Sequence, residues 1–431
     1  MGNSIKSFIW LDNPIRLYYH KLRWIIANLV NGFPSRNMII VWITGTNWKT
    51  TTTNIIAKWL KEAWYKVFMF STVNIMIWDK EFVNDTKMTS PDAFLLQSLL
   101  KQAKNEWCTV AIIETSSHSI LMNRNFWLDY DIAVLTNITQ DHLDLHKTMD
   151  NYVETKLQLF KNLITYRRKS WIKKVAVINN ESDYKDLFLA ETYDNLYTYW
   201  QSSSSTLKLE NIEYSYDSTS FDLKVAWTKT TLETYLRGKF NLYNIMAAVW
   251  VFVSFWMKQE EIKKVILSVK WVAWRMEEIK NKKNIKIFID YAHTPDALKN
   301  VLDTLKEIEW VNRIITVFWA TWDRDKTKRP IMWKVVSERS DIVILTQDDD
   351  YTEKTEKIIK DVLPWIERKE WEGFWIIPER REAIRTALLS AEENDIILVA
   401  WKWDEHMLVT NSWMVPWHDR EVVEEILKEI E

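Results

Sequence analysis

The sequence predicts an α/β protein with a mostly parallel sheet in each of two successive domains. Short apolar runs that suit buried strands alternate with helical stretches, a pattern typical of parallel α/β architecture. Polar residues follow the carboxyl ends of these runs, where open parallel sheets bind their ligands. A polar and basic stretch at 280–284 is the predicted linker between the domains. The length of 431 residues is sufficient for two or three domains with their own cores.

The predicted elements follow one another along the chain. Apolar periodicity in the first domain predicts buried strands at 38–43, 110–113, 132–135 and 174–178. Helices are predicted at 50–63 and 241–257. Alternating polar and apolar residues, rich in Thr, Ser and Tyr, predict a small antiparallel excursion over 207–236. In the second domain, strands are predicted at 285–289, 314–318, 342–345 and 396–399.

The N-terminal segment and the bulk composition narrow the class of protein. Leu22–Val30 is apolar, but Arg23 interrupts it and it is too short to cross a bilayer. We expect an amphipathic helix that packs on the protein body, with a membrane surface as the alternative. Met1–Asn13 has no secretory signal pattern, and the single cysteine, Cys108, suits a reducing cytoplasm. A formal net charge of −2 gives no sign of a nucleic-acid partner.

Tryptophan takes the place of glycine in the composition. The chain contains 27 Trp and 5 Gly. Glycine is usually about 7% of a protein, so about 30 glycines are expected. We hypothesise that most of these tryptophans are glycine in the translated protein, because some bacterial lineages read the codon UGA as glycine. The alternative is a protein that is genuinely rich in tryptophan.

A phosphate-binding loop is predicted where the first strand meets the first helix of this domain. Lys49 would reach the β- and γ-phosphates, and Thr50 or Thr51 would bind Mg²⁺ through its hydroxyl. Glycine is needed at position 48, because backbone N–H groups must approach the anion closely. With a genuine Trp48, the loop is damaged and the alternative is an inactive protein. The predicted nucleotide-binding residues of the loop are Gly45, Thr46, Asn47, Trp48, Lys49, Thr50 and Thr51.

With Trp48 read as glycine, the string TGTNWKTTT at 44–52 resembles the Mur ligases, the ATP-dependent amide-forming enzymes of peptidoglycan synthesis. Further segments resemble motifs of this family in the family's order, namely 112–120, 135–160, 238–248, 272–279, 290–298, 320–330, 379–384 and 400–405. Eleven tryptophans fall where family members carry glycine: Trp42, Trp48, Trp64, Trp127, Trp271, Trp274, Trp319, Trp322, Trp333, Trp401 and Trp403. The resemblance implies a helical segment (1–37), a central ATP-binding domain of P-loop type (38–284) and a Rossmann-like, amino-acid-binding C-terminal domain (285–431).

The resemblance also implies a reaction through an acyl phosphate, with ATP and Mg²⁺ as cofactors. The γ-phosphoryl group of ATP would pass to the terminal carboxylate of UDP-N-acetylmuramoyl-L-alanyl-D-glutamate, and the amine of a free amino acid would then attack. The implied catalytic and metal-binding residues are Lys49, Thr50, Glu114, His142 and Lys156, the last as a carbamate. From the residues alone, Lys156 is an exposed helix lysine and His142 a core or capping histidine. Asn137 and Asp141 are expected to hold the metal site in place.

Other residues are assigned to ligands by the same resemblance. The further nucleotide contacts are Asn241, Arg275 and Asp290. The contacts with the muramoyl peptide are Thr89, Ser90, Ser116, Ser117 and Arg124. The residues near the incoming amino acid are Asp349, Asp350, Tyr351, Arg380 and Glu405. The loop charges of the second domain are expected at the site rather than on a solvated face: His293, Asp323, Arg324, Lys328 and Arg329.

The chain departs from the family pattern in two places that bear on the substrates. About 37 residues precede the nucleotide strand, where family members carry a domain for the UDP group. The UDP group is therefore expected to be held differently, or the substrate is not a conventional UDP sugar. The family's DNPR motif for meso-diaminopimelate is replaced by Asp348–Tyr351. An acidic trio without that arginine suits a cationic side chain and favours L-lysine as the amino acid. Separately, we expect the protein to be a monomer.

Two other functions remain open from the sequence. One is a different enzyme of the superfamily, such as a folylpolyglutamate synthase or a cyanophycin-type ligase. The strings DYAHTPD and DHLD-x-H weigh against the first of these. The other is a catalytically inactive scaffold that binds cell-wall enzymes, which requires Trp48 to be genuine.

Overall fold

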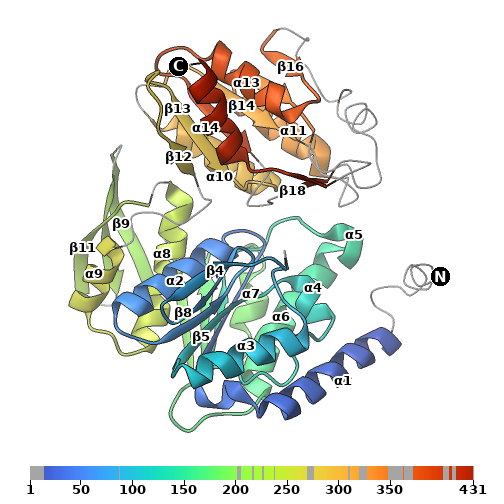
Figure 1. The fold of residues 1–431 in the computed structure, drawn as a ribbon. Helices are drawn as coiled ribbons and strands as arrows, with labels where there is room; N and C mark the ends of the chain where they lie inside the picture. The colour runs from blue at the N-terminus through green and yellow to red at the C-terminus, as the bar shows by residue number, and fades with distance from the viewer. Residues whose placement is uncertain are drawn as a thin grey trace, which may run out of the picture. The chain divides into compact units, whose positions relative to one another are not determined.

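The structure is a computed structural model, and it divides into two compact units. The first comprises Met1–Thr139, Leu145–Leu236 and Phe240–Val272, and the second comprises Gln140–Asp144, Arg237–Lys239 and Ala273–Glu431. Figure 1 draws most of the first in blue to yellow and most of the second in orange to red. The structure describes residues 14–86, 88–200, 205–215, 218–225, 228–236, 238–268, 276–308, 311–319, 328–347, 363, 372–400, 407–409 and 414–430.

The described residues of the first unit form an 11-stranded sheet with a parallel, apolar centre. The strand order is β11-β10-β9-β8-β7-β6-β1-β5-β2-β3-β4. The parallel strands are β1 (Ile39–Thr44), β2 (Val67–Phe70), β5 (Val110–Glu114), β6 (Ile132–Leu135), β7 (Val175–Asn179) and β8 (Asn195–Tyr199). The four strands predicted in this part of the chain are therefore confirmed, each within one residue at either end.

Antiparallel strands extend both edges of this sheet. On one edge, β9 (Leu207–Tyr214) pairs in parallel with β8 and forms an antiparallel meander with β10 (Thr219–Val225) and β11 (Thr228–Thr234), which confirms the predicted excursion. On the other edge, β3 (Asn74–Ile77) and β4 (Lys80–Val83) follow β2 in antiparallel order. This second meander was not predicted, because its strands are short and all four residues of β4 are exposed.

Helices cover both faces of the sheet. Successive residues of β1 point to opposite faces, so Val41 and Ile43 belong to one core and Ile40 and Trp42 to the other. The first core includes α2 (Lys49–Glu62), α8 (Lys239–Ser254) and α9 (Gln259–Ser268). The second core includes α1 (Pro14–Asn31), α3 (Ala93–Asn105), α6 (Met149–Thr165) and α7 (Lys185–Leu189). The shorter helices of the first part of the chain are η1 (Pro34–Asn37), α4 (Ser117–Leu121) and α5 (Leu143–His146).

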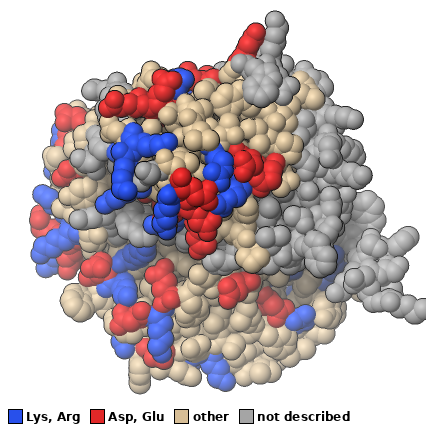
Figure 2. Space-filling model, turned by 45° about the horizontal axis from the view of Figure 1, so that its top comes forward, with Lys and Arg blue, Asp and Glu red and all other residues tan. Residues whose placement is uncertain are grey.

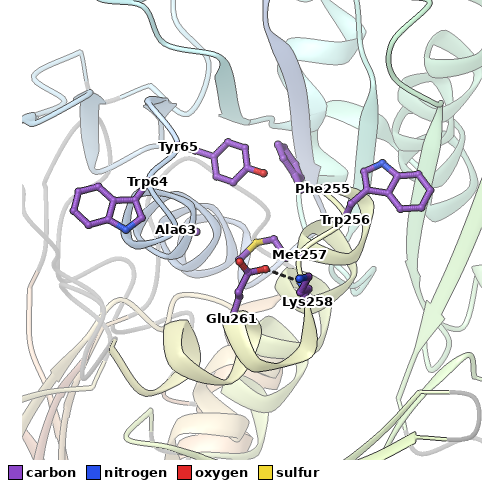
Figure 3. A pocket seen from close by; sticks show the side chains of 8 residues that line it. All are labelled: Ala63, Trp64, Tyr65, Phe255, Trp256, Met257, Lys258 and Glu261. Atoms are coloured by element: carbon purple, nitrogen blue, oxygen red, sulfur yellow. Dashed lines mark hydrogen bonds between the residues drawn. The ribbon is translucent and has the colours of Figure 1, made fainter.

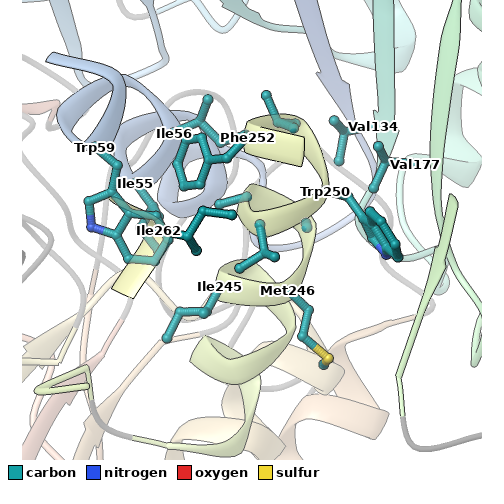
Figure 4. Packing of buried hydrophobic residues seen from close by; sticks show 14 of the residues in the cluster. Ile55, Ile56, Trp59, Val134, Val177, Ile245, Met246, Trp250, Phe252 and Ile262 are labelled. Atoms are coloured by element: carbon teal, nitrogen blue, oxygen red, sulfur yellow. The ribbon is translucent and has the colours of Figure 1, made fainter. Parts of the chain in front are cut away.

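The packing of α2 against α8 positions the nucleotide loop that precedes α2. The rings of Trp59 on α2 and Phe252 on α8 lie 5.4 Å apart between centroids (Figure 4). Helix α8 is buried along most of its length, and Trp250 belongs to the same core as Val177 of the sheet (Figure 4). The predicted helices at 50–63 and 241–257 are confirmed with shifted ends.

Helix α1 confirms the predicted N-terminal helix and is longer than predicted. One face is buried through Trp24, Ala27 and Asn28, in agreement with packing on the protein body. Its other face is exposed, with Ile15 at 78% and Tyr18 at 69%. In the part of the chain that the structure describes, no helix is both long enough and apolar enough to cross a membrane.

The second unit is built on a six-stranded sheet in the order β12-β13-β17-β14-β15-β16, as far as the described residues show. It is parallel apart from β12 at one edge, which confirms a second, mostly parallel α/β unit. The strands are β12 (Glu277–Ile279), β13 (Lys286–Asp290), β14 (Ile314–Phe318), β15 (Ile342–Leu345), β16 (Phe374–Ile376) and β17 (Ile396–Ala400). The helices are α10 (Pro295–Lys306), α11 (Lys328–Arg339), α13 (Arg380–Ser390) and α14 (Asp419–Ile430). A separate two-stranded sheet pairs β18 (Met407–Val409) with β19 (Met414–Pro416) in antiparallel order.

Charged side chains of both signs are interspersed on the surface drawn in Figure 2. On the surface of the second unit, some of these opposite charges form ion pairs. Arg381 donates to both Glu425 and Glu429 at 2.8 Å, from α13 to α14. Among the described residues on that face, no large area of a single charge dominates.

Candidate functional site

The loop between β1 and α2 is tied to the segment that follows β6. The N–H groups of Thr46 and Asn47 donate to the carbonyl and side-chain oxygens of Asn137, both at 2.8 Å. Gly45 has a φ of 155°, and a Cβ at this position would lie 1.9 Å from Thr136 Oγ1. Because even a methyl group would collide there, only glycine fits at position 45.

Two lysine amines converge on this loop from different helices. Lys49, the first residue of α2, donates from Nζ to the carbonyl oxygen of Thr46 at 2.7 Å. Lys156 on α6 donates from Nζ to the carbonyl oxygen of Gly45 at 2.7 Å. Lys156 is 1% exposed and its amine lies 4.5 Å from the ring centroid of Tyr152. The interpretation of Lys156 as an exposed helix lysine is therefore wrong, because α6 turns this side chain inward.

A carboxylate and a hydroxyl meet beside the loop. Glu114, the last residue of β5, is 1% exposed and accepts from Thr50 Oγ1 at 3.0 Å through Oε1. Its Oε2 accepts from the N–H of Thr72 at 2.8 Å. Carboxylate and hydroxyl oxygens are ligands that Mg²⁺ accepts, so the chemistry of this pair fits the ion. No cluster of three or more His, Cys, Asp or Glu side chains suitable for a metal occurs within the described ranges.

The residues predicted to contact the muramoyl peptide lie near this carboxylate. Thr72 bridges to them, because its Oγ1 donates to Thr89 Oγ1 at 2.9 Å. The N–H of Ser116 lies 3.5 Å from Ser90 Oγ, and Ser116 Oγ caps α4. The structure therefore brings three of the predicted peptide-contacting residues close to Glu114.

Two further predicted contacts have partners within the chain. Ser117 is buried and its Oγ lies 3.0 Å from His146 Nε2. Arg124 points Nη1 towards Met88 Sδ at 3.8 Å. Burial lowers the pKa of the Arg124 guanidinium, Asp92 raises it, and the charges of Arg16 and Arg23 lower it further. A contact of Arg124 with the muramoyl peptide stays a prediction.

Sequence reasoning missed Thr72 and Tyr152. Thr72 follows β2 and carries no motif that marks it. Tyr152 lies one helical turn before Lys156 on α6, and its hydroxyl is 3.0 Å from Thr46 Oγ1. The helical spacing to a candidate lysine is a signal that the sequence did contain.

In the second unit, Asp141 is a buried carboxylate held by cations. Lys328 Nζ lies 3.2 Å from Asp141 Oδ1 and 3.3 Å from the carbonyl oxygen of His293, to which it also donates. His142 Nε2 lies 3.4 Å from Asp141 Oδ2. Burial by itself would raise the pKa of Asp141, but Lys328, His142 and His293 hold it well below its usual range. Asp141 is therefore ionised, and its role in holding the metal site stays a prediction.

The predicted nucleotide residues have identifiable partners where they are described. Asp290, at the end of β13, accepts from the N–H of Met276 at 2.8 Å. In the first unit, Asn241 Oδ1 accepts from Asn244 Nδ2 at 3.1 Å. Asn244 in turn accepts from Thr52 Oγ1 on α2 at 2.9 Å. These amides link the start of α8 to the helix that begins at the phosphate loop.

Arg380 has a different environment from the one expected of a substrate-binding residue. It is fully buried, and Nε and Nη2 lie 2.8 and 2.7 Å from the carboxylate oxygens of Asp419. A contact of Arg380 with the amino acid stays a prediction. Several predicted residues lie outside the described ranges, namely Arg275, Asp323, Arg324, Asp348, Asp349, Asp350, Tyr351 and Glu405.

Trp48 has the backbone of a glycine in this structure. It precedes α2 with a φ of 69°, a left-handed conformation. Its indole stacks on the ring of Tyr243 on α8, with centroids 5.0 Å apart. Trp322 and Trp401, which also fall where family members carry glycine, lie outside the described residues.

Comparison with known proteins gives matches along most of the chain. The family model of the Mur ligase middle domain matches residues 43–252, and that of the Mur ligase glutamate ligase domain matches residues 274–401. The UDP-N-acetylmuramoyl-L-alanyl-D-glutamate–2,6-diaminopimelate ligase of Clostridium botulinum is 36% identical over 408 residues, which cover 94% of this chain and 81% of that protein. The enzyme of the same name from Caldanaerobacter subterraneus is 34% identical over 407 residues, with coverage of 94% and 81%.

Solved structures agree with these matches. A structure of a UDP-N-acetylmuramoyl-L-alanyl-D-glutamate–2,6-diaminopimelate ligase has a TM-score of 0.64 at 27% identity and covers 96% of this chain and 83% of that one. Folylpolyglutamate synthase of Mycobacterium tuberculosis, complexed with ADP and AMPPCP, has a TM-score of 0.73 at 16% identity, with coverage of 89% and 92%. This second likeness shows a shared fold. With two family models in order and relatives above 30% identity, the chain belongs to the Mur ligase family, whose members are ATP-dependent ligases of peptidoglycan synthesis.

Proposed function

We propose that this protein joins an amino acid to the terminal carboxylate of UDP-N-acetylmuramoyl-L-alanyl-D-glutamate in the cytoplasm. One observation carries the proposal. Thr50, Glu114 and Lys156 converge on a loop that begins with an obligatory glycine, in a chain whose relatives bear the name of this reaction. We also retain the three-part division at residues 37 and 284 as a proposal.

The reaction uses the loop to hold ATP. The loop N–H groups and Lys49 offer donors to the phosphates, where charge develops as the γ-phosphoryl group is transferred. An oxygen of the substrate carboxylate attacks the γ-phosphorus, and ADP leaves, which forms an acyl phosphate. The amine nitrogen of the amino acid then attacks the acyl carbon, the amine loses a proton, and inorganic phosphate leaves as the amide forms. Asn241, Arg275 and Asp290 are the further nucleotide contacts in this proposal.

Thr50 and Glu114 would hold Mg²⁺, because a hydroxyl and a buried carboxylate already lie within hydrogen-bonding distance of each other. The bound ion supplies positive charge that offsets the charge of the transferring phosphoryl oxygens. A carbamate on Lys156 is proposed as a ligand of a second ion, and His142 is kept as a further proposed metal ligand. The position of Lys156 beside the loop supports this role, since a carbamate would replace its ammonium with an anionic, carboxylate-like group that can bind a cation.

The carbamate has its own test. Protein equilibrated with ¹³C-bicarbonate is expected to show a carbamate carbon resonance that Lys156→Arg lacks. Lys161→Arg is the matched control, because Lys161 is on the same helix and its amine pairs with exposed Glu154 at 2.7 Å. A resonance that persists in Lys156→Arg would contradict the assignment.

For the amino acid, we propose 2,6-diaminopimelate. The relatives above 30% identity carry this substrate in their names. The acidic trio Asp348–Asp350 favours L-lysine, but it lies outside the described residues and the relatives lend the lysine preference no support. Thr89, Ser90, Ser116 and Arg124 are the proposed contacts of the muramoyl peptide.

The test is release of phosphate from ATP with UDP-N-acetylmuramoyl-L-alanyl-D-glutamate and a panel of amino acids, for a chain with glycine at position 48. We expect release that depends on both substrates and is greatest with meso-diaminopimelate. L-lysine as the best substrate would refute the choice of amino acid while leaving the ligase proposal intact. Activity only with a folate and glutamate would refute the proposal itself. Lys49→Ala is the inactive control.

A further inference from the structure

Seven tryptophans of the described chain have backbone conformations that favour glycine. Their φ values are 69° at Trp48, 67° at Trp64, 53° at Trp78, 63° at Trp107, 61° at Trp127, 138° at Trp200 and 60° at Trp256. A positive φ is a marked outlier for a bulky side chain, because its Cβ crowds the neighbouring carbonyl. The backbone conformation at these positions therefore favours glycine, which has no Cβ.

Three of these tryptophans end helices in the same way as a genuine glycine of this chain. Gly32 follows α1 with a φ of 70°, and the next N–H, that of Phe33, donates to a carbonyl five residues back at 3.1 Å. Trp64, Trp107 and Trp256 follow α2, α3 and α8 with the same pattern, at 2.9, 2.9 and 3.2 Å. Glycine is the usual residue at this point of the motif. The three indoles are 89%, 78% and 84% exposed, so burial does not favour tryptophan there.

Two of these tryptophans, Trp64 and Trp256, line the pocket between the ends of α2 and α8. Figure 3 shows Trp64 and Trp256 on opposite sides of it, with Glu261 accepting from the N–H of Lys258 at 2.7 Å. Both tryptophans occupy the glycine point of a helix end. Glycine at these two positions would remove two walls of the pocket, so we assign no ligand to it.

The other informative pair lies over the phosphate loop. The ring of Tyr243 on α8 stacks on Trp48 at 5.0 Å, with 19° between the planes, and on Trp200 at 3.3 Å, with 9° between the planes. Trp200 follows β8 and is fully buried. Both partners of Tyr243 thus have left-handed backbone, and both indoles take up space beside the helix that begins at the loop.

We propose that positions 48 and 200 are glycine in the translated protein and that Tyr243 stacks on the base of the bound nucleotide. The inference rests on the proposed function, since it requires a nucleotide at the loop. Removing two indoles uncovers a planar aromatic ring next to the phosphate-binding turn. A purine is a planar partner of similar size, and aromatic stacking on bases tolerates many orientations.

The ring of Tyr243 is held in one orientation. Its hydroxyl donates to Glu181 Oε2 at 2.7 Å, which anchors the far end of the ring. The buried amides of Asn241 and Asn244 on the same helix bond to each other at 3.1 Å and to Thr52 of α2 at 2.9 Å, which fixes the start of α8 against the helix that begins at the loop. Tyr243 therefore offers an oriented stacking surface for a planar base.

The codons give the first test. Positions 48 and 200 are expected to be encoded by UGA, and UGG at either position would overturn the assignment of glycine there. The second test measures binding of ADP and of inorganic tripolyphosphate by calorimetry to a chain that carries Trp48→Gly and Trp200→Gly. This chain is expected to bind both, whereas the chain with tryptophan at both positions is expected to bind neither tightly.

Tyr243→Ala in the glycine-bearing chain isolates the stacking. We expect it to weaken ADP binding by about tenfold to a hundredfold and to leave tripolyphosphate binding unchanged. Tyr243→Phe is expected to retain most of the affinity and guards against misfolding. Tyr197→Ala is the matched control, because Tyr197 stacks on Trp250 at 4.2 Å in the same unit.

The outcomes separate the two proposals. If ADP and tripolyphosphate both bind and Tyr243→Ala affects neither, or weakens both equally, the stacking role is overturned. If the glycine-bearing chain binds neither ligand, the proposed nucleotide-dependent function is overturned as well.

Discussion

Removing Asp419, the buried partner of Arg380, is expected to destabilise the second unit strongly. Their side chains are 0% and 2% exposed, and two N–H groups of the guanidinium reach the carboxylate at 2.8 and 2.7 Å. In Asp419→Asn the guanidinium stays buried without its counter-ion. Removing one partner of a buried pair costs about 3–5 kcal/mol, and asparagine keeps one acceptor oxygen, so we expect a loss of about 3 kcal/mol.

The measurement is equilibrium unfolding in urea, followed by far-UV circular dichroism. Glu425→Gln is the matched control, because Glu425 pairs with Arg381 between the same two helices but is 58% exposed. An exposed pair of this kind contributes about 0–1 kcal/mol. If Asp419→Asn costs no more than the control, burial does not set the strength of this pair and the reasoning is refuted.

Three other predictions follow from single positions. Gly45→Ala is expected to abolish ADP binding in calorimetry, because the new Cβ would lie 1.9 Å from a hydroxyl oxygen. Gly32→Ala is the control and should retain binding, because nothing lies within 4 Å of a Cβ at that position. Equal effects of the two changes would contradict the steric argument. The folded-state pKa of Asp141 is lowered, so its stabilisation is complete above the unfolded pKa of about 3.9 and is lost as the pH falls. Unfolding titrations should show that Lys328→Met flattens this acid slope, and an unchanged slope would exclude Lys328 as its source. Burial raises the pKa of Cys108 to about 11, so iodoacetamide at pH 8 should label the native protein slowly and the urea-unfolded protein quickly, and equal rates would refute the burial.

The parallel strands were predictable because their signal is local. Strands such as β6 and β14 are short apolar runs buried on both faces, and the structure reproduces their predicted bounds. Strand β4 was not predicted, because its stability comes from pairing with β3 rather than from its own residues. Which face of α1 is exposed was not predictable either, because it is decided by the part of the protein on which the helix packs.

The candidate site was predictable only where a motif names its residues. The loop and Glu114 were predicted from strings that resemble one family. Thr72 was not, because its role comes from a hydrogen bond to Glu114, 42 residues away in sequence. Arg380 was predicted at the substrate, but only the packing of α13 against α14 reveals Asp419 as its partner.

By itself, the sequence determined the α/β class, the positions of most of the parallel strands along the chain and the resemblance to the Mur ligases, because these depend on local patterns of residues. It also signalled that tryptophan stands where glycine is expected. Only the tertiary structure decided which side chains meet at the loop and which tryptophans have glycine-like backbone. The sign of φ at Trp48 or Trp200 is set by how a strand turns into the next element, and the stack on Tyr243 is set by the packing of α8. Both depend on contacts between distant parts of the chain, which no local pattern contains.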